Sequence, residues 1–160
     1  MKKLMLLGAF ALLGAINVNA QSGFKLGANV GLPVGDANII NSFTLGVDAS
    51  YLWPVAESLN LGVATGFQSY FPKSEWKDAG AKNLNIVPIA ASAQYMFSPE
   101  FSLGVDLGYG FAFSDGESDG DFYYAPKAAY HFGPSEVNLS YRGIGDGGSV
   151  NLGYAYSFGK

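Results

Sequence analysis

The chain ends with the stretch SVNLGYAYSFGK, residues 149–160. Large apolar residues stand at every second position of its middle part, at Val150, Leu152, Tyr154, Tyr156 and Phe158. The residues between them are small or polar. Because successive side chains of a strand point to opposite faces, this two-residue period predicts a β-strand with two different faces. Whether water or lipid meets the apolar face decides the class of protein.

The same alternation recurs in seven earlier segments, at about residues 24–32, 43–53, 59–71, 83–97, 101–113, 122–132 and 137–141. We expect the third segment to slip in phase near Ser69 and Tyr70. Pro88 and Pro126 lie inside predicted strands, and because proline donates no ladder hydrogen bond, we expect a bulge or local distortion at each. Eight such strands predict an all-β fold.

The connections between the segments alternate in length. PVAES, SPE and GPS follow the second, fourth and sixth segments, and their composition is typical of tight turns. The other connections are longer and more polar: PVGDANIINS, PKSEWKDAGAKN, SDGESDGD and GIGDGGS. Short turns at one end and long loops at the other are typical of transmembrane barrels. We therefore predict an eight-stranded antiparallel up-and-down transmembrane β-barrel, with both termini at the short-turn end.

The first 20 residues have the features of a secretory signal. Lys2 and Lys3 precede an apolar core from Leu4 to Ile16, and Ala20 ends a sequence suited to cleavage. The apolar core is short for a membrane span, which takes about 20 residues. We predict a signal peptide at residues 1–20 and a single β-barrel domain at residues 21–160.

Composition excludes several classes of function. Without Lys2 and Lys3, seven Lys and Arg stand against 13 Asp and Glu, so a basic nucleic-acid-binding surface is not expected. The sequence has no Cys, so the fold must be stable without disulfides. Its 12 Phe and 10 Tyr, with only 14% charged residues, fit a chain made of many half-buried strands.

Charged residues within the strands indicate which face meets lipid. Six lie in strand bodies, all on the small-residue face: Lys25, Asp48, Asp106, Lys127, Glu136 and Arg142. A cation on the lipid-facing side at mid-membrane would cost about 2–4 kcal/mol, which explains why the apolar row carries none. The opposite assignment, a soluble ligand-binding barrel, would crowd the aromatic residues into a lumen that eight strands make narrow. We predict a closed lumen holding an ion-pair network.

Aromatic residues gather near both ends of the predicted strands. Those near the short-turn end are Trp53, Tyr95, Phe97, Phe101, Tyr130, Phe132, Tyr156 and Phe158. Those near the long-loop end are Phe43, Phe67, Phe71, Tyr109, Phe111, Phe113, Phe122 and Tyr124. Two aromatic belts that flank smaller aliphatic residues match the two interfaces of a bilayer, so we predict these residues at the membrane boundaries.

The segment NIVPIAASAQYMF, residues 85–97, resembles the Ile-Pro-Ile strand of bacterial outer-membrane barrel domains. Residues 149–160 resemble the closing strand that barrel-assembly machinery reads. Taken whole, residues 21–160 resemble the small eight-stranded outer-membrane barrels of the OmpA transmembrane-domain and OmpX-like type. This resemblance implies a Gram-negative outer membrane as the location, with both termini periplasmic. The partners that it implies are outer-membrane lipids, lipopolysaccharide and the assembly machinery.

Two glycine-rich motifs carry possible chemistry. GIGDGG, residues 143–148, is spelled like a dinucleotide-binding loop, but a strand follows where that loop needs a helix. DGESDG, residues 115–120, begins like a calcium loop, but Pro126 takes the place of its bidentate Glu. We predict a hairpin loop at the first motif. At the acidic loop Asp115–Asp121 we leave open weak binding of a divalent cation that bridges lipopolysaccharide phosphates. We expect no cofactor.

His131 is the only histidine. The lipid A deacylase family has this barrel architecture, with a His-Ser catalytic pair near the outer leaflet, whereas we predict His131 at the short-turn end and inside the lumen. We therefore expect it to form hydrogen bonds there, and we expect no enzymatic activity. The function predicted is a structural or surface-interaction role in the outer membrane. The alternatives are a narrow passive pore and a lipid-modifying enzyme.

Overall fold

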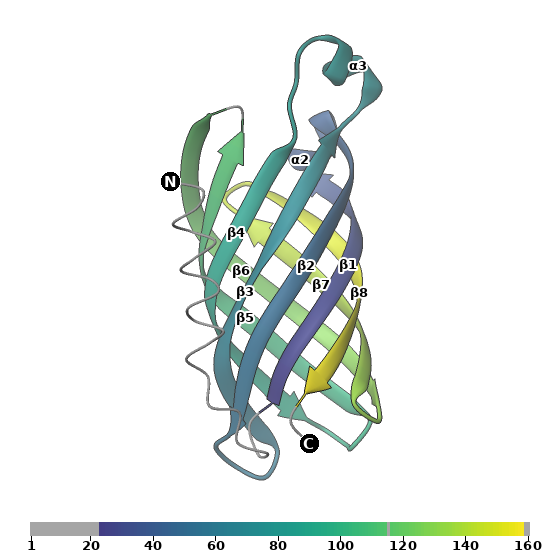
Figure 1. Ribbon diagram of the computed structural model, residues 1–160, viewed down its shortest axis with the longest axis vertical. Coiled ribbons are helices and arrows are strands. Elements are labelled where there is room, and N and C mark those ends of the chain that lie inside the picture. The colour runs from purple at the N-terminus through teal and green to yellow at the C-terminus, as the bar shows by residue number, and fades with distance from the viewer. Residues whose placement is uncertain (1–22, 115, 159–160) are drawn as a thin grey trace.

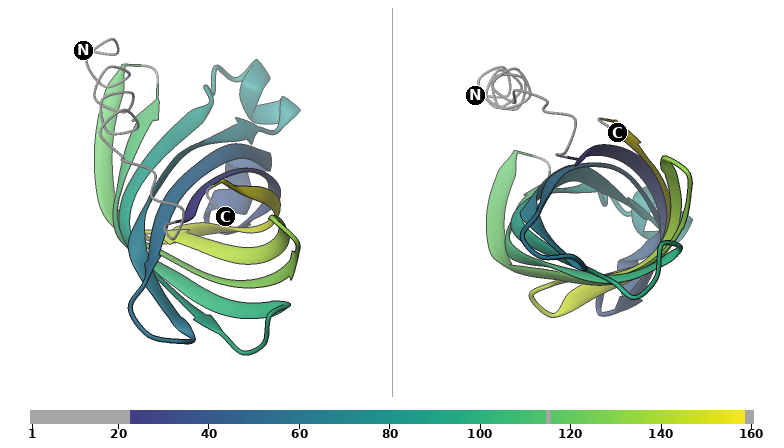
Figure 2. Two further views of the ribbon diagram at one scale, coloured as in Figure 1. Left: turned by 60° about the horizontal axis from the view of Figure 1, so that its bottom comes forward. Right: turned by 90° about the horizontal axis from the view of Figure 1, so that it is seen from below.

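The computed structural model describes residues 23–114 and 116–158, and the expected signal peptide at residues 1–20 lies outside them. The described chain is a closed barrel of eight antiparallel strands in chain order, which confirms the predicted fold class (Figures 1 and 2). The strands are β1 (Gly23–Gly35), β2 (Asn41–Pro54), β3 (Leu59–Pro72), β4 (Leu84–Met96), β5 (Phe101–Ser114), β6 (Glu117–Phe132), β7 (Ser135–Ile144) and β8 (Gly147–Phe158).

The closing strand identified from the sequence completes the ring. β8 pairs with β1 from Phe24 opposite Phe158 to Gly35 opposite Gly147, and it pairs with β7 on its other side. The start of β1 and the end of β8 therefore lie at the same end of the barrel, next to the turns at residues 55–58, 97–100 and 133–134. A closed ladder leaves no strand edge unpaired within a bilayer.

Two of the four connections predicted as long loops are hairpins instead. β5 and β6 continue the pairing up to Ser114 opposite Glu117, and β7 and β8 continue it up to Ile144 opposite Gly147. Gly116 and Gly145 adopt φ of 84° and 55° at these turns, a conformation that two-residue hairpin turns require and that glycine adopts without strain. The polar composition of these stretches therefore gave a wrong loop length.

The other two connections at this end are longer, as predicted. The first contains the one-turn helix α2 (Ala37–Ile40), and the second contains α3 (Ser74–Asp78) followed by extended chain up to β4. The β5–β6 hairpin and the α3 loop rise well above the barrel, whereas the β7–β8 turn stays low (Figure 1). The rim of the barrel is therefore uneven in height.

The predicted phase slip near Ser69 and Tyr70 is wrong. β2 and β3 pair without a shift from Phe43 opposite Phe71 onward, and the only shift in this ladder falls between Asn41 and Phe43. Tyr70 simply keeps its place on the inner face, where it is 3% exposed. In the sequence, a large side chain on the small-residue face has the same pattern as a change of face.

Both prolines interrupt the ladder without a bulge. The β3–β4 pairing is broken beside Pro88, and the β6–β7 pairing is broken beside Pro126, while the register on either side of each gap is the same. At the first gap the Thr65 hydroxyl donates to the Pro88 carbonyl at 2.8 Å. The local distortion expected at each proline is therefore present, and at Pro88 a side chain bonds to the carbonyl beside the gap.

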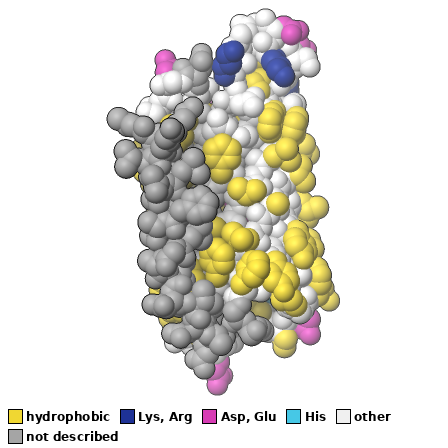
Figure 3. All heavy atoms as spheres, viewed as in Figure 1, with side chains coloured by type: hydrophobic (Ala, Val, Ile, Leu, Met, Phe, Trp, Pro, Cys, Tyr) yellow, Lys and Arg dark blue, Asp and Glu magenta, His cyan; other side chains and the backbone are white. Residues whose placement is uncertain are grey.

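The two faces of the wall have opposite character. Inside, Thr44, Ser149 and Asn151 are fully buried, whereas outside Leu139 is 56% and Leu152 is 55% exposed. Yellow apolar side chains are spread over the part of the exterior that is visible between the two ends (Figure 3). Such an exterior is unfavourable in water and favourable in lipid, so the barrel wall is built for a membrane. Within the described residues, no helix has the length and apolar character needed for a membrane span.

Candidate functional site

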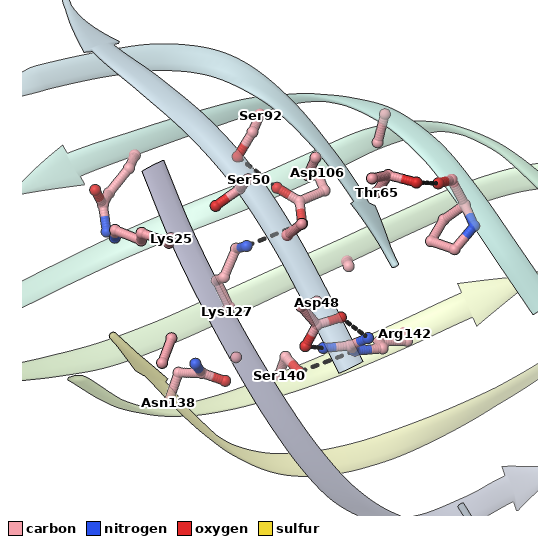
Figure 4. Close-up of a pocket in the computed structure, with 18 of the residues that line it drawn as sticks. Lys25, Asp48, Ser50, Thr65, Ser92, Asp106, Lys127, Asn138, Ser140 and Arg142 are labelled. Atoms are coloured by element: carbon pink, nitrogen blue, oxygen red, sulfur yellow. Dashed lines mark hydrogen bonds and ion pairs between the residues drawn. The ribbon is translucent and has the colours of Figure 1, made fainter. Parts of the chain in front are cut away.

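The lumen brings together all six charged residues singled out from the sequence. They form three ion pairs: Lys25 with Glu136 at 2.7 Å, Lys127 with Asp106 at 2.9 Å, and Arg142 with Asp48 at 2.8 Å. Figure 4 shows the last two pairs pointing into the same pocket from different strands. Strand alternation explains this placement, because each of the six occupies an inward position of its strand.

The Arg142–Asp48 pair crosses the lumen. Its residues belong to β7 and β2, which are separated in the ring by β8 and β1. The guanidinium binds both carboxylate oxygens at 2.8 Å, and the Asn29 amide donates to one of them at 2.8 Å. Such a bidentate pair is the strongest arrangement of these two groups. It ties opposite parts of the wall together.

Above this pair, toward the α3 end, an uncharged network fills the lumen. We name it the polar plug, and its members are Thr44, Gln68, Tyr70, Ser149 and Asn151. The Gln68 amide donates to Thr44 Oγ1 and to Asn151 Oδ1, both at 2.9 Å. The Tyr70 hydroxyl donates to Ser149 Oγ at 3.1 Å, and Arg142 donates to Gln68 Oε1 at 3.1 Å. The plug and the ion pair therefore form one continuous network.

Sequence reasoning did not identify the polar plug. Its members stand at inward positions of their strands, so the alternation could have placed each one in the lumen. Their partners were not predictable, however, because Thr44 and Asn151 are 107 residues apart and meet only when the barrel closes.

A second network lies in the lumen near the short-turn end. Lys25 holds Glu136, whose carboxylate also lies 3.4 Å from His131 Nδ1. His131 Nε2 lies 2.7 Å from Ser102 Oγ, and the Gln94 amide donates to that hydroxyl at 3.0 Å. His131 thus takes part in lumen hydrogen bonding, as expected from the sequence.

The order serine, histidine, carboxylate also occurs in hydrolases, where the serine is the nucleophile. Ser102 is only 3% exposed and already accepts a hydrogen bond from Gln94. Glu136 is bound to Lys25, so its charge is largely compensated. The arrangement cross-links β5, β6 and β7.

A small cavity lies between the two networks. Its volume is about 60 Å³, and charged groups of all three ion pairs line it together with Ser92, Tyr123 and Asn138 (Figure 4). A buried water needs about 10–15 Å³ of such volume, so the cavity has room for a few waters. It is too small for an ordinary organic ligand, whose pockets measure about 300–1,000 Å³.

Most of the aromatic residues predicted at the membrane boundaries form ring contacts with a neighbouring aromatic residue. Near the short-turn end the pairs are Tyr51–Trp53, Tyr95–Phe97, Phe101–Tyr130 and Tyr156–Phe158, with ring centroids 4.8–6.1 Å apart. Near the other end Phe43 stacks on Phe71 at 4.6 Å and Phe122 on Tyr124 at 6.1 Å, whereas Tyr109 meets Phe111 edge to face at 4.9 Å. The structure thus groups them at two levels.

The acidic stretch Asp115–Asp121 lies mainly in strand β6, and Asp115 itself is outside the described residues. Asp119 and Asp121 each accept a hydrogen bond from the next residue's N–H, of Gly120 at 2.8 Å and Phe122 at 2.7 Å. Across residues 23–114 and 116–158, no three His, Cys, Asp or Glu side chains come together as a metal site. The described part of the stretch therefore holds no cluster of three such side chains.

Comparison of the sequence with known protein families and with curated proteins gave no match. Comparison of the structure with solved structures did. The attachment invasion locus protein Ail of Yersinia pestis matches with a TM-score of 0.56 and 18% identity, over 86% of this chain and 97% of Ail. A second Ail structure, in complex with the heparin analogue sucrose octasulfate, matches with a TM-score of 0.53 and 20% identity, over 86% of this chain and 97% of that one.

A de novo designed transmembrane β-barrel matches with a TM-score of 0.54 and 19% identity, over 85% of this chain and 95% of the design. The N-terminal barrel domain of OprF from Pseudomonas aeruginosa matches with a TM-score of 0.50 and 14% identity, over 86% and 98% of the two chains. At such identities the likeness concerns the fold. The chain therefore has the fold of small outer-membrane β-barrels, and its apolar exterior and polar lumen suit that location.

Proposed function

We propose that this chain is an integral outer-membrane barrel with a structural or surface-interaction role, and that its lumen is sealed. The observation that carries the proposal is the continuous hydrogen-bonded network across the lumen, from Asp48 and Arg142 through Gln68 to the fully buried Thr44, Ser149 and Asn151. Buried polar groups that are paired in this way resist opening, because each broken bond leaves a partner unsatisfied.

The barrel's orientation follows from its two ends. Short turns are typical of the periplasmic side of such barrels and longer segments of the outside, so the α3 loop and the β5–β6 hairpin would face the surroundings of the cell. These two segments would supply the surface for contacts. The complex of Ail with a heparin analogue supports a surface-interaction role for barrels of this fold.

Several further roles belong to the same proposal. The paired aromatic residues at both levels would sit at the two membrane interfaces. The closing strand β8 would present its outward row to the barrel-assembly machinery. Residues 1–20 would direct export and be removed, which N-terminal sequencing of the purified chain would test by a first residue at Gln21.

The membrane assignment is tested by expression of the full chain, cell fractionation and gel migration in detergent with and without boiling. We expect the chain in the outer-membrane fraction and a shift in migration on heating, because a closed barrel resists unfolding by detergent. Recovery of the whole chain in the soluble fraction without detergent would refute the proposal.

A narrow pore is the second candidate, since a polar cavity lies beneath the plug. Recordings of the purified barrel in planar bilayers separate the two candidates. A sealed lumen predicts a flat current trace, whereas reproducible conductance steps would favour the pore. We propose no enzymatic activity, because Ser102 is buried and engaged at the one site where a serine meets a histidine.

A further inference from the structure

The lysines at the outward end of the barrel are confined to one loop. Of the Lys and Arg side chains that the structure describes, only Lys73, Lys77 and Lys82 lie outside the lumen. All three belong to the connection between β3 and β4 that carries α3. Figure 3 shows dark-blue lysine atoms at this end, directly above the apolar exterior. The same loop carries Glu75 and Asp78, whereas the other described outward segments carry acidic residues and no Lys or Arg, so the positive charge of this end is confined to one sector of the wall.

A groove runs from this loop down to the apolar wall. Its volume is about 520 Å³, and Phe43, Phe71, Lys73, Lys77 and Asn83 are among the residues that line it. Phe43 and Phe71 are stacked at 4.6 Å on the outer face of β2 and β3, and they form the apolar lower part. The two lysines lie at its upper part, together with Glu75, so the cationic groups outnumber the anionic one.

The wall changes character at the level of the groove. On the outer face, Phe67 of β3 is followed two residues later by Ser69, whose hydroxyl lies 2.5 Å from Asn85 Oδ1 of β4. Phe71 comes next on the same face, and Lys73 follows at the end of the strand. The row therefore runs from an apolar residue through a hydroxyl and an aromatic ring to a cation, as expected for a wall that passes from the acyl chains to the headgroups of a bilayer.

We propose that the groove binds a phosphorylated lipid of the outer leaflet, with its phosphate between Lys73 and Lys77 and an acyl chain against Phe43 and Phe71. The proposal rests on the membrane location proposed above. Two features favour a lipid as the occupant: the groove is continuous with the lipid-facing wall, and lysines complement an anionic headgroup there. The Asn83 amide, at the same groove, supplies a further donor for a phosphate oxygen.

Native mass spectrometry of the full barrel in detergent micelles tests the site. The probes are lipid A with both phosphates and the same lipid with the phosphates removed. We expect the barrel to retain the phosphorylated lipid selectively. The double variant K73Q/K77Q should bind it at least about tenfold more weakly, since each lost charged hydrogen bond reduces affinity by about that factor. K82Q is the matched control, because Lys82 lies in the same loop but does not line the groove.

A Phe43→Ala variant tests the apolar part separately. It should weaken binding of both lipids to a similar extent, because it removes contact with an acyl chain and leaves the lysines in place. Equal retention of the two lipids by the unmodified barrel would overturn the proposal, as would an equal loss in K82Q and in the double variant. Heat-modifiable migration, measured on every sample, separates failure of the lipid site from failure of the membrane proposal. A folded barrel without lipid selectivity refutes the lipid site alone. A chain that forms no barrel refutes the membrane function as well.

Discussion

Single side chains in this barrel are constrained by which face of the wall they occupy. On the inner face a polar or charged group finds partners across the lumen, as Arg142 finds Asp48 and Gln68. On the outer face a polar or charged group would meet lipid, which offers it no hydrogen-bond partner. Neighbouring residues of one strand therefore tolerate opposite kinds of substitution, and this difference is measurable.

Leu139 and Asn138 form a matched pair for that measurement. Leu139 is 56% exposed on the outer face, whereas Asn138 lines the cavity beside Glu136. Leu139→Lys should lower the free energy of unfolding in lipid vesicles by about 2–4 kcal/mol, the cost of a cation at mid-membrane. Asn138→Lys should cost much less, because Glu136 lies within reach. Similar losses in urea titrations of the two variants would contradict the assignment of faces.

Removal of the Arg142 guanidinium should destabilise the barrel more than removal of an exposed charge. Arg142→Ala leaves the Asp48 carboxylate without its main partner, and we expect a loss of about 3 kcal/mol in the free energy of unfolding, at the low end for buried pairs because Asp48 is partly exposed. Arg142→Lys should recover part of this loss, since one ammonium cannot bind both oxygens as the guanidinium does. A loss no larger than that of Lys82→Ala in the same urea titration would argue against a stabilising role for the pair.

At the scale of elements, the β5–β6 hairpin is the one that needs protection. β6 pairs with β7 only from Tyr123 onward, so residues 117–122 lack a strand on that side. The carboxylates of Asp119 and Asp121 bind the N–H groups of Gly120 and Phe122 along this stretch. Since the unpaired N–H groups of a strand edge can bond to another chain, these two aspartates protect the edge from such pairing.

The double variant D119A/D121A should therefore self-associate through the hairpin. We expect larger particles in light scattering of the detergent-solubilised barrel, with unchanged heat-modifiable migration because the membrane part is untouched. D36A/D146A is the control, as it removes the same charge from the outward end without changing this edge. If both double variants aggregated to the same extent, charge repulsion would explain the effect and the edge would not.

The elements themselves were largely predictable, and the reasons differ from part to part. Strand alternation placed Lys25, Asp106 and the other lumen charges correctly, because the period of two depends only on the local chain. The β5–β6 hairpin was not predictable from SDGESDGD, since polar residues there form a protruding ladder as readily as a loop. The inward position of Tyr70 was not predictable, because its hydroxyl bonds to Ser149 of β8, which comes within reach only when the ring closes. Local rules thus gave the strands, and only the closed barrel determined the contacts across the lumen.

At the scale of the whole molecule, the lumen is divided along its axis. The polar plug occupies the part toward the α3 end, the Lys25–Glu136 network lies near the short turns, and a cavity of about 60 Å³ lies between them. A continuous water path would need both networks to open. This division supports the proposed sealed barrel over the narrow pore.

Removal of the plug side chains should change that property. In the variant Q68A/N151A the amide groups that join Thr44, Arg142 and Ser149 are lost. We expect conductance steps in planar bilayers from this variant, against a flat trace from the unmodified barrel. The control N60A/N138A removes two amides that lie outside the plug and should stay closed. Identical flat traces from all three proteins, each shown to be inserted, would mean that the Arg142–Asp48 pair and the lower network close the lumen without the plug.

The pairing of Phe24 with Phe158 has a consequence for chain connectivity. In a ring closed by hydrogen bonds no strand is first or last in space. The chain ends lie at only one of the eight boundaries between neighbouring strands. A short linker between the ends of β1 and β8 would complete the circle, and the two-residue turn at Gly145 and Asp146 could then be cut to give new ends. Such a circular permutant would keep every pair of neighbouring strands and would have β7 as its final strand. It would therefore separate the strand pairing that the folded barrel requires from the C-terminal strand that the cell's insertion apparatus recognises.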